Sequence, residues 1–341
     1  MKNRVLYLDI IRILACLMII AMHAPIPNTG LSSYLLASDS LLTVPGIGLF
    51  IMVSGALLLP VNISTDQFLK KRFGKIVGPT IFWTVFYYLL APYTETVNQG
   101  NGVLSFLSIP FTSQYNSVLW FMYMLAGLYL LAPILSAWLR QASKREVEFY
   151  LSLWGITLCY PLIRDIVRVD ESHTGILYYF GGYIGYFLLG YYLRNHVNHI
   201  SIWKCLLAII FPLGIATSFK MQGMQVRFYD MFWYLSIFVA MMAVAWFLLI
   251  KKADMVYDNA SKWHRYIVLI SNCCFGIYLT HIFVMRSLLW NWTVIHELKG
   301  IVQIGTVTIL SFTGSFIITR LISYLPWAEY IIGIKTIKPH K

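Results

Sequence analysis

Long blocks of apolar residues recur along the whole chain, and short polar or charged segments separate them. Blocks such as 5–24 and 235–250 approach the ~20 apolar residues that an α-helix needs to cross a ~30 Å hydrocarbon core. Arg12 lies in the middle of the first block and Pro25 follows it without a clear cleavage site, so we expect a spanning helix rather than a cleaved signal. The blocks predict helices at about 5–24, 40–60, 75–92, 117–139, 149–164, 177–194, 203–219, 229–250, 265–289 and 302–325.

This pattern predicts one all-α, polytopic membrane bundle of about ten transmembrane helices. We expect a transmembrane domain over residues 5–325 and a short basic cytoplasmic tail over residues 326–341. Composition agrees with this prediction, because 59% of the residues are hydrophobic and 12% are charged, whereas about 25% are charged in a typical soluble domain. A soluble protein of this length could not bury so much apolar surface.

The formal net charge of +12 would indicate nucleic acid binding in a soluble protein. Here the basic residues lie between the apolar blocks, where the positive-inside rule explains them. By this count 18 of the 26 lysines and arginines lie on one side of the membrane, five lie on the other, and three lie inside helices. We therefore predict that both termini are cytoplasmic and that the protein binds no nucleic acid.

Three ionisable residues, Asp9, Arg12 and His23, lie within the first predicted helix. Each costs about 2.5–3.5 kcal/mol or more inside a membrane, so such groups usually face the bundle interior and mark function. Arg12 and His23 are 11 residues apart, which places them about 20° apart around a helix and ~16 Å apart along it. Asp9 lies one turn before Arg12 and can pair with it. If the helix starts inside, His23 is nearer the outer surface.

The spacing of Arg12 and His23 suits a long, thin donor with a charged end. Acyl-coenzyme A carries phosphates at one end and a thioester at the other, and a pantetheine arm of comparable length separates them. Arg12 is then expected to hold phosphate oxygens, which guanidinium groups bind well, while His23 acts at the thioester. A second interpretation stays open, in which Asp9 and Arg12 only anchor the helix and His23 is an interfacial histidine.

Five motifs occur in order along the chain. They are Leu8–Arg12 (LDIIR) with Met22–His23, Gly48–Gly55 (GLFIMVSG), Phe68–Lys75 (FLKKRFGK), Leu119–Tyr123 (LWFMY) with Tyr129–Pro133 (YLLAP), and Phe275–His281 (FGIYLTH). This series resembles the acyltransferase-3 family of membrane-bound sugar O-acyltransferases over roughly residues 5–325. An arginine and a histidine separated by ten residues in the first helix are the hallmark of that family.

The resemblance implies a membrane-bound O-acyltransferase of the bacterial cytoplasmic membrane, with acetyl as the expected acyl group. The donor would be cytoplasmic acyl-coenzyme A (acetyl-CoA). The acceptor would be a hydroxyl of a cell-envelope polysaccharide or of a lipid-linked sugar, and membrane lipid would surround the protein. His23 and Arg12 would be catalytic, His23 as general base or transient acyl carrier and Arg12 as the residue that orients the donor.

Further site residues follow from the same motifs. The basic segment, expected to be a cytoplasmic loop, carries Lys71, Arg72 and Lys75 as cofactor-binding residues, although topology alone also explains basic residues there. We assign Trp120, Tyr123, His281 and Asp9 to substrate binding. Aromatic belts are the alternative for Trp120 and Tyr123. An interfacial histidine bonded to a carbonyl is the alternative for His281, which we expect at the depth of His23. Ser54 and Gly55 are expected to allow close helix packing.

The other titratable groups carry no recognisable chemistry. The five cysteines lie in or beside apolar segments without CxxC or metal-ligand spacing, so we expect packing residues and no metal. The main rival function is a transporter or flippase for a polyisoprenoid-linked saccharide, with Asp9, Arg12 and His23 as a proton relay. A sensory membrane module is a third possibility, which the lack of a soluble output segment disfavours.

Overall fold

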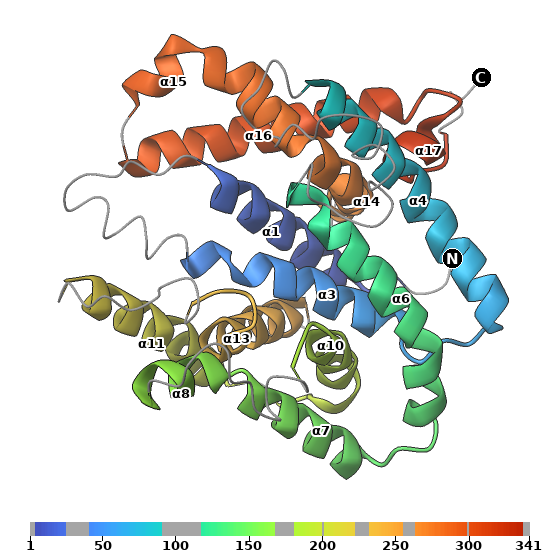
Figure 1. Ribbon diagram of the computed structural model, residues 1–341, viewed down its shortest axis with the longest axis vertical. Coiled ribbons are helices and arrows are strands. Elements are labelled where there is room, and N and C mark those ends of the chain that lie inside the picture. Colours follow the sequence, from blue (N-terminus) through green and yellow to red (C-terminus); the bar gives the residue numbers. More distant parts are fainter. Residues whose placement is uncertain are drawn as a thin grey trace. The chain divides into compact units, whose positions relative to one another are not determined.

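The computed structural model describes residues 4–24, 41–90, 117–167, 181–199, 201–221, 232–254, 263–298 and 300–336 (Figure 1). Every regular element in these ranges is a helix, as predicted. Seven of the described segments are long and apolar enough to cross a membrane, which makes the chain a multi-pass membrane protein. They are Leu6–His23, Leu41–Leu58, Thr65–Leu90, Trp120–Leu139, Ile202–Phe219, Trp263–Asn291 and Gly300–Ile322.

The chain divides into two compact units. The first unit comprises Met1–Leu59, Ala137–Ser271 and Lys299–Ile304. Its helices are α1 (Leu6–His23), α3 (Pro45–Leu58), α7 (Lys144–Thr157), α8 (Tyr160–Val167), α10 (Ile184–His196), α11 (Ile202–Met221), α13 (Ile237–Asp254) and the first half of α14 (Trp263–Ile282).

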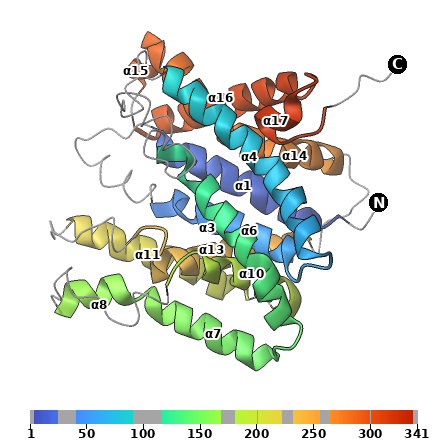
Figure 2. The ribbon, with the colours of Figure 1, turned by 45° about the vertical axis from the view of Figure 1, so that its right-hand side comes forward.

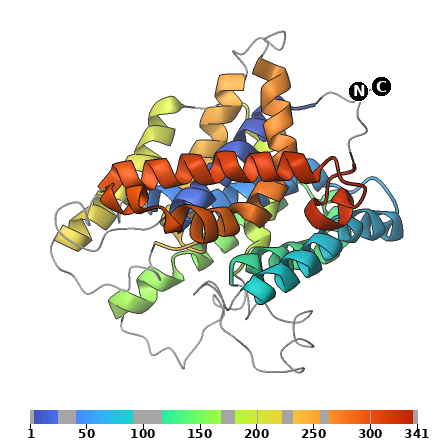
Figure 3. The same cartoon turned by 90° about the horizontal axis from the view of Figure 1, so that it is seen from above.

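The second unit comprises Pro60–Ser136, Asn272–Leu298 and Gly305–Lys341. It contains α4 (Thr65–Leu90), η2 (Ser117–Leu119), most of α6 (Trp120–Leu139), the second half of α14, η3 (Phe283–Leu288), η4 (Leu289–Asn291), α15 (Thr293–Glu297), most of α16 (Gly300–Ile322) and α17 (Ala328–Ile332). Figure 3 shows α16 as one long, unbroken helix.

In the first unit, α3 and α10 pack closely through two glycines. A Cβ atom built at Gly55 would overlap the carbonyl oxygen of Phe187, and one built at Gly190 would overlap the carbonyl oxygen of Met52. Each helix therefore supplies the glycine that admits the backbone of the other. Ser54 turns its hydroxyl back to the Phe50 carbonyl of its own helix, at 3.0 Å. The prediction that this motif allows close packing is confirmed for Gly55.

Two basic side chains in the same unit donate hydrogen bonds to backbone carbonyls at the C-terminal ends of helices. Arg194 Nη1 donates to the carbonyl of Ala56, near the end of α3, at 2.5 Å. The buried Lys251 Nζ donates to the carbonyls of Leu193, Arg194 and Val197, around the end of α10, at 2.8, 3.0 and 2.7 Å. The last carbonyls of a helix lack intrahelical partners and carry partial negative charge, so both cations stabilise these ends.

The basic segment Phe68–Lys75 is helical, and our prediction of a loop there is wrong. Helix α4 begins at Thr65 and continues without a break to Leu90 (Figure 2). The Ser64 hydroxyl accepts from the Gln67 backbone N–H at 3.3 Å, and the Ser64 carbonyl accepts from Phe68 at 2.9 Å. Ser64 therefore starts the helix ten residues before the predicted start, and the charged residues form its first turns.

The helix predicted at 149–164 is two helices. A capping box between Ser143 and Glu146 starts α7 at Lys144, and α7 ends at Thr157. Helix α8 follows from Tyr160, with Pro161 in its first turn. Pro161 has no N–H to donate to the carbonyl of Thr157, four residues earlier, so a continuous helix is interrupted where α7 ends. Neither α7 nor α8 is among the seven candidate spans.

In the second unit, α4 is held on two sides. Trp83 Nε1 donates to the carbonyl of Ile331 at 2.8 Å, and Gly78 lies against Tyr330, so α17 packs along α4. Nearer the start of α4, the rings of Phe68 and Tyr129 meet edge to face with their centroids 6.2 Å apart. The basic first turns of α4 therefore pack against α6, and α17 packs against α4 further along the helix.

Candidate functional site

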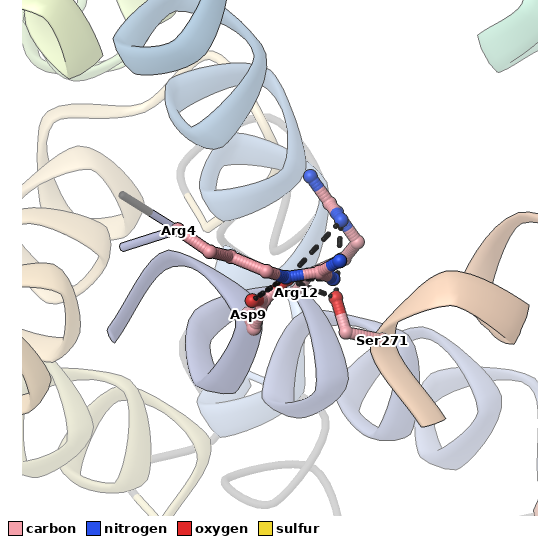
Figure 4. Close-up of polar contacts among 4 residues, drawn as sticks. All are labelled: Arg4, Asp9, Arg12 and Ser271. Carbon is pink, nitrogen blue, oxygen red and sulfur yellow. Dashed lines mark hydrogen bonds and ion pairs between the residues drawn. The ribbon is translucent and has the colours of Figure 1, made fainter. Parts of the chain in front are cut away.

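The site in the first unit is built on α1. This helix is continuous over 18 residues, so the predicted placement of Arg12 and His23 on one face holds for the observed helix. Asp9 and Arg12 lie one turn apart near its start, and His23 lies in its last turn. Figure 4 shows the polar contacts at the start of the helix, among Arg4, Asp9, Arg12 and Ser271.

Asp9 is the centre of this cluster and is only 4% exposed. Arg4 donates to both of its oxygens, with Nε to Oδ2 at 2.6 Å and Nη2 to Oδ1 at 2.8 Å. The Ser271 hydroxyl, from α14, donates to Oδ1 at 2.6 Å. Arg12 Nη1 is 3.5 Å from the same Oδ1, which is an ion pair without a close hydrogen bond. The predicted Asp9–Arg12 pair therefore exists, but Arg4 makes the tighter one.

Arg12 is oriented through Ser271 rather than held directly by Asp9. Its Nη1 donates to the Ser271 hydroxyl at 3.0 Å. A guanidinium carries five N–H donors, and no other hydrogen bond of Arg12 occurs within the residues that the structure describes. The side chain is 26% exposed. Two guanidinium groups thus share one carboxylate, and the cluster retains a net positive charge with free donors on Arg12. That arrangement suits an anionic ligand.

His281 lies in the second unit and is fully buried at the end of α14. Its Nδ1 is 2.5 Å from the carbonyl oxygen of Tyr278. Because a carbonyl can only accept, this bond places a proton on Nδ1 and makes Nε2 an acceptor in the neutral ring. The carbonyl contact agrees with the alternative interpretation from the sequence. Complete burial places the ring inside the protein rather than on its surface.

The three predicted donor-binding cations lie on the first turns of α4. Lys71 and Lys75 are exposed, whereas Arg72 is half-buried. The Arg72 guanidinium carbon lies 5.6 Å from the centre of the Phe68 ring, within range of a cation–π contact. Its Nε is buried and lacks a hydrogen-bond partner within the described residues. This donor can therefore make a charge-assisted hydrogen bond to an anion, and the exposed cations add positive charge on the same turns of α4.

Tyr123 lies in a groove of about 210 Å³ between α4 and α6. The groove is lined by Phe73, Ile76, Val77, Thr80, Ile81, Thr84, Met122, Tyr123 and Ala126. The hydroxyls of Thr80 and Thr84 donate to carbonyls of their own helix, at 2.6 and 2.7 Å, so most of the lining is apolar. Trp120, the half-buried first residue of α6, does not line this groove.

The predicted site residues thus form two groups. Asp9, Arg12 and His23 share α1 in the first unit. In the second unit, Lys71, Arg72 and Lys75 on α4 neighbour α6, which carries Trp120 and Tyr123, and His281 is on α14. Sequence reasoning missed Ser271 and the pairing role of Arg4. In the described ranges, no group of three His, Cys, Asp or Glu side chains is placed to hold a metal ion.

Arg12 uses one of its N–H donors on Ser271, and its remaining donors suit charge-assisted hydrogen bonds to an anionic ligand. The acyltransferase-3 family model, an acyltransferase domain, matches residues 5–320, so the chain belongs to this family and is an acyltransferase that transfers groups other than aminoacyl groups. The family resemblance of the five motifs is thereby confirmed. Comparison with curated proteins and with solved structures finds no significant match.

Proposed function

We propose that this protein is an O-acyltransferase that moves an acyl group, most simply acetyl, from cytoplasmic acyl-coenzyme A to a hydroxyl of a cell-envelope polysaccharide or lipid-linked sugar. One observation carries the proposal. Helix α1 of this acyltransferase holds an arginine with free N–H donors at its start and a histidine in its last turn. At 1.5 Å per residue, the two are ~16 Å apart, about the length of a pantetheine arm.

The donor's phosphates are proposed to meet the cationic residues. Arg12 is positioned by Ser271 and keeps free donors. Arg72 contributes a buried Nε without a partner in the described ranges, and Lys71 and Lys75 add exposed charge next to it. Guanidinium groups bind phosphate with directional hydrogen bonds, and lysines act as point charges. Arg12 in the first unit and the three cations of α4 in the second are therefore each suited to bind phosphate oxygens.

His23 is proposed to act at the thioester. As general base it accepts the proton of the acceptor hydroxyl while the hydroxyl oxygen attacks the thioester carbonyl. The carbon–sulfur bond then breaks, and the coenzyme A thiolate leaves and takes up a proton. In the second version His23 is itself acylated and passes the acyl group to the hydroxyl. Both versions require His23 and lose the reaction without it.

Acceptor binding is proposed for Tyr123, Trp120 and His281. Asp9 contributes indirectly, because it accepts from the Ser271 hydroxyl that orients Arg12. The order of the motifs also resembles that of the enterobacterial common antigen O-acetyltransferase, which favours a cell-envelope glycan as acceptor. We further propose about ten membrane-spanning helices, both termini in the cytoplasm, and the bacterial cytoplasmic membrane as the location. Basic residues between the apolar segments support this orientation.

Labelled acetyl-coenzyme A tests the proposal directly. Purified protein in detergent should bind coenzyme A and release labelled acetate slowly without acceptor, since water can replace the sugar hydroxyl. Membranes that contain the acceptor should gain label in an alkali-labile ester. A protein that neither binds acetyl-coenzyme A nor labels any acceptor, but moves a lipid-linked saccharide across liposomes, would be a transporter instead.

A further inference from the structure

Asp9 lies close enough to pair with two arginines, and its contact with Arg4 is the tighter one. Arg4 forms a two-point contact with the carboxylate, at 2.6 and 2.8 Å. Arg12 stays 3.5 Å from the nearer oxygen and hydrogen-bonds to Ser271 instead. A two-point pair between guanidinium and carboxylate is the strongest geometry available to this pair of groups. Arg4 therefore occupies the contact that Arg12 would otherwise take.

Arg4 and Arg12 compete for the Asp9 carboxylate, and its burial makes a close partner necessary. Asp9 is 4% exposed, so its charge needs a partner close by. Arg12 lies one turn further along the same helix, at a spacing that favours a direct ion pair. If Arg4 were absent, Arg12 would be the nearest cation and would close the remaining gap to Asp9. Its guanidinium would then be engaged and partly neutralised.

We propose that Arg4 is a positioning residue, which by pairing with Asp9 keeps the Arg12 guanidinium available for the anionic end of the donor. This inference rests on the proposed function for its ligand. Ser271 completes the arrangement because its hydroxyl donates to Asp9 and accepts from Arg12, at 2.6 and 3.0 Å. The hydroxyl thus separates the two charges while fixing the direction of Arg12.

The distinctive consequence is a rescue. Arg4→Gln removes the competing charge, so Arg12 should form a direct ion pair with Asp9. Because its guanidinium is then engaged, the affinity for coenzyme A should fall about tenfold. Asp9→Asn removes the carboxylate that draws Arg12 away. The Arg4→Gln/Asp9→Asn double variant should therefore bind coenzyme A within about threefold of wild type. A residue that contacts the donor directly could not be rescued in this way.

Calorimetry with coenzyme A on detergent-purified variants measures the effect. Arg145→Gln is the matched control, because Arg145 is an exposed basic residue in the first turn of α7, outside the cluster. Its affinity should equal that of wild type. If Arg4→Gln binds coenzyme A normally, or if Asp9→Asn fails to restore binding, the positioning role is wrong. In the latter case Arg4 would contact the donor itself.

A second readout needs no donor. Phenylglyoxal modifies accessible arginines, and peptide mass spectrometry gives the rate at Arg12 alone. This rate should fall in Arg4→Gln and recover in the double variant; an unchanged rate would overturn the proposal. Wild-type protein that fails to bind coenzyme A would count against the proposed function, while the phenylglyoxal rates would still decide whether Arg4 controls Arg12.

Discussion

Arg12 illustrates how one residue can be both anchored and available. Its Nη1 is fixed by Ser271, and its charge is only partly balanced because Asp9 is already bound by Arg4. A cation whose charge is only partly balanced is costly inside a membrane protein, so its retention favours a functional role. The partial exposure of the side chain leaves a route for a ligand to reach it.

Replacing Arg12 should weaken donor binding more than it disturbs the fold. Arg12→Ala removes a charge-assisted contact worth about 1.5–3 kcal/mol, which corresponds to a loss of coenzyme A affinity of roughly ten- to a hundredfold. Arg12→Lys should recover part of this loss, since the charge returns without the planar fork. Calorimetry on monodisperse protein measures both. Because Asp9 retains Arg4, Asp9→Asn/Arg12→Ala should behave like Arg12→Ala; equal affinity in wild type and Arg12→Ala would contradict the phosphate role.

For these residues, the sequence predicted the contact between Asp9 and Arg12 and missed the contact between Asp9 and Ser271. Asp9 and Arg12 are three residues apart, so helix geometry alone brought them together. Ser271 is 262 residues from Asp9, and nothing in its own surroundings marks it. Arg4 was visible only as a charge that helps to set topology. Its contact with Asp9 depends on an extended residue at the helix N-terminus, Val5, which periodicity does not describe.

Helix starts were the least predictable property of the elements, although their signals were present. Ser64 and Gln67 begin α4, and Ser143 and Glu146 begin α7. Both pairs have the spacing of a serine cap followed by Glu or Gln. The prediction placed boundaries by hydropathy, which follows the membrane interior and ignores polar first turns. The helices therefore extend beyond their apolar blocks, and the basic residues of α4 share one rigid helix with the groove residues.

The basic turns of α4 give a prediction with a matched control. Replacing Lys71, Arg72 and Lys75 together by Gln should raise the KM for acyl-coenzyme A and lower the salt dependence of donor binding, because exposed charges act through screened fields. Lys70→Gln is the control, since Lys70 is exposed and pairs with Asp66 at 3.1 Å in the same helix. Kinetics in membranes at two ionic strengths measure this. A triple variant with a normal KM for the donor would mean that these basic residues set membrane orientation and do not bind the donor.

The contact between α3 and α10 gives a stability prediction. Gly190→Ala would place a methyl group on the carbonyl oxygen of Met52, so the helices must separate, at a cost of about 1–3 kcal/mol or more. Gly127→Ala on α6 is the matched control, because among the described residues no atom outside its own helical surroundings lies within 4 Å of the added carbon. Thermal unfolding in detergent should show a lower Tm for Gly190→Ala and an equal or slightly higher Tm for Gly127→Ala. Equal Tm values for the two variants would contradict the close packing.

For the whole molecule, composition was a sufficient guide to class. The fraction of apolar residues predicted a multi-pass helical membrane protein, and seven described segments bear this out. The total of ten helices stays a prediction. The helix predicted at 149–164 differs from the structure for a physical reason, because Pro161 divides it into α7 and α8. The helix predicted to end at residue 250 continues as α13 to Asp254, with Lys251 and Lys252 in its last turn. Lys251 donates to carbonyls at the end of α10, so these charged residues belong to the helix.

Membrane orientation can be tested with reporter fusions. The distribution of basic residues predicts an outer-side signal for a fusion at Gly100, which lies outside the described residues, and a cytoplasmic signal for a fusion at Ser143. Ser143 precedes the capped and charged start of α7. A phosphatase reporter, active outside, and a fluorescent reporter, active inside, should give complementary results at the two sites. The reverse pattern would overturn the orientation and place the start of α1 outside.

The central claim is that α1 holds the donor at Arg12 and carries out the transfer at His23. His23→Ala is the most direct test, because it removes the side chain proposed to act at the thioester and leaves the Arg12 cluster intact. His199→Ala, at an exposed position after α10, is the matched control. Acyl transfer from labelled acetyl-coenzyme A in membranes is measured beside coenzyme A affinity of the same purified variants. The account predicts that His23→Ala loses transfer and binds coenzyme A nearly as well as wild type, while His199→Ala retains both. Full transfer by His23→Ala would contradict it.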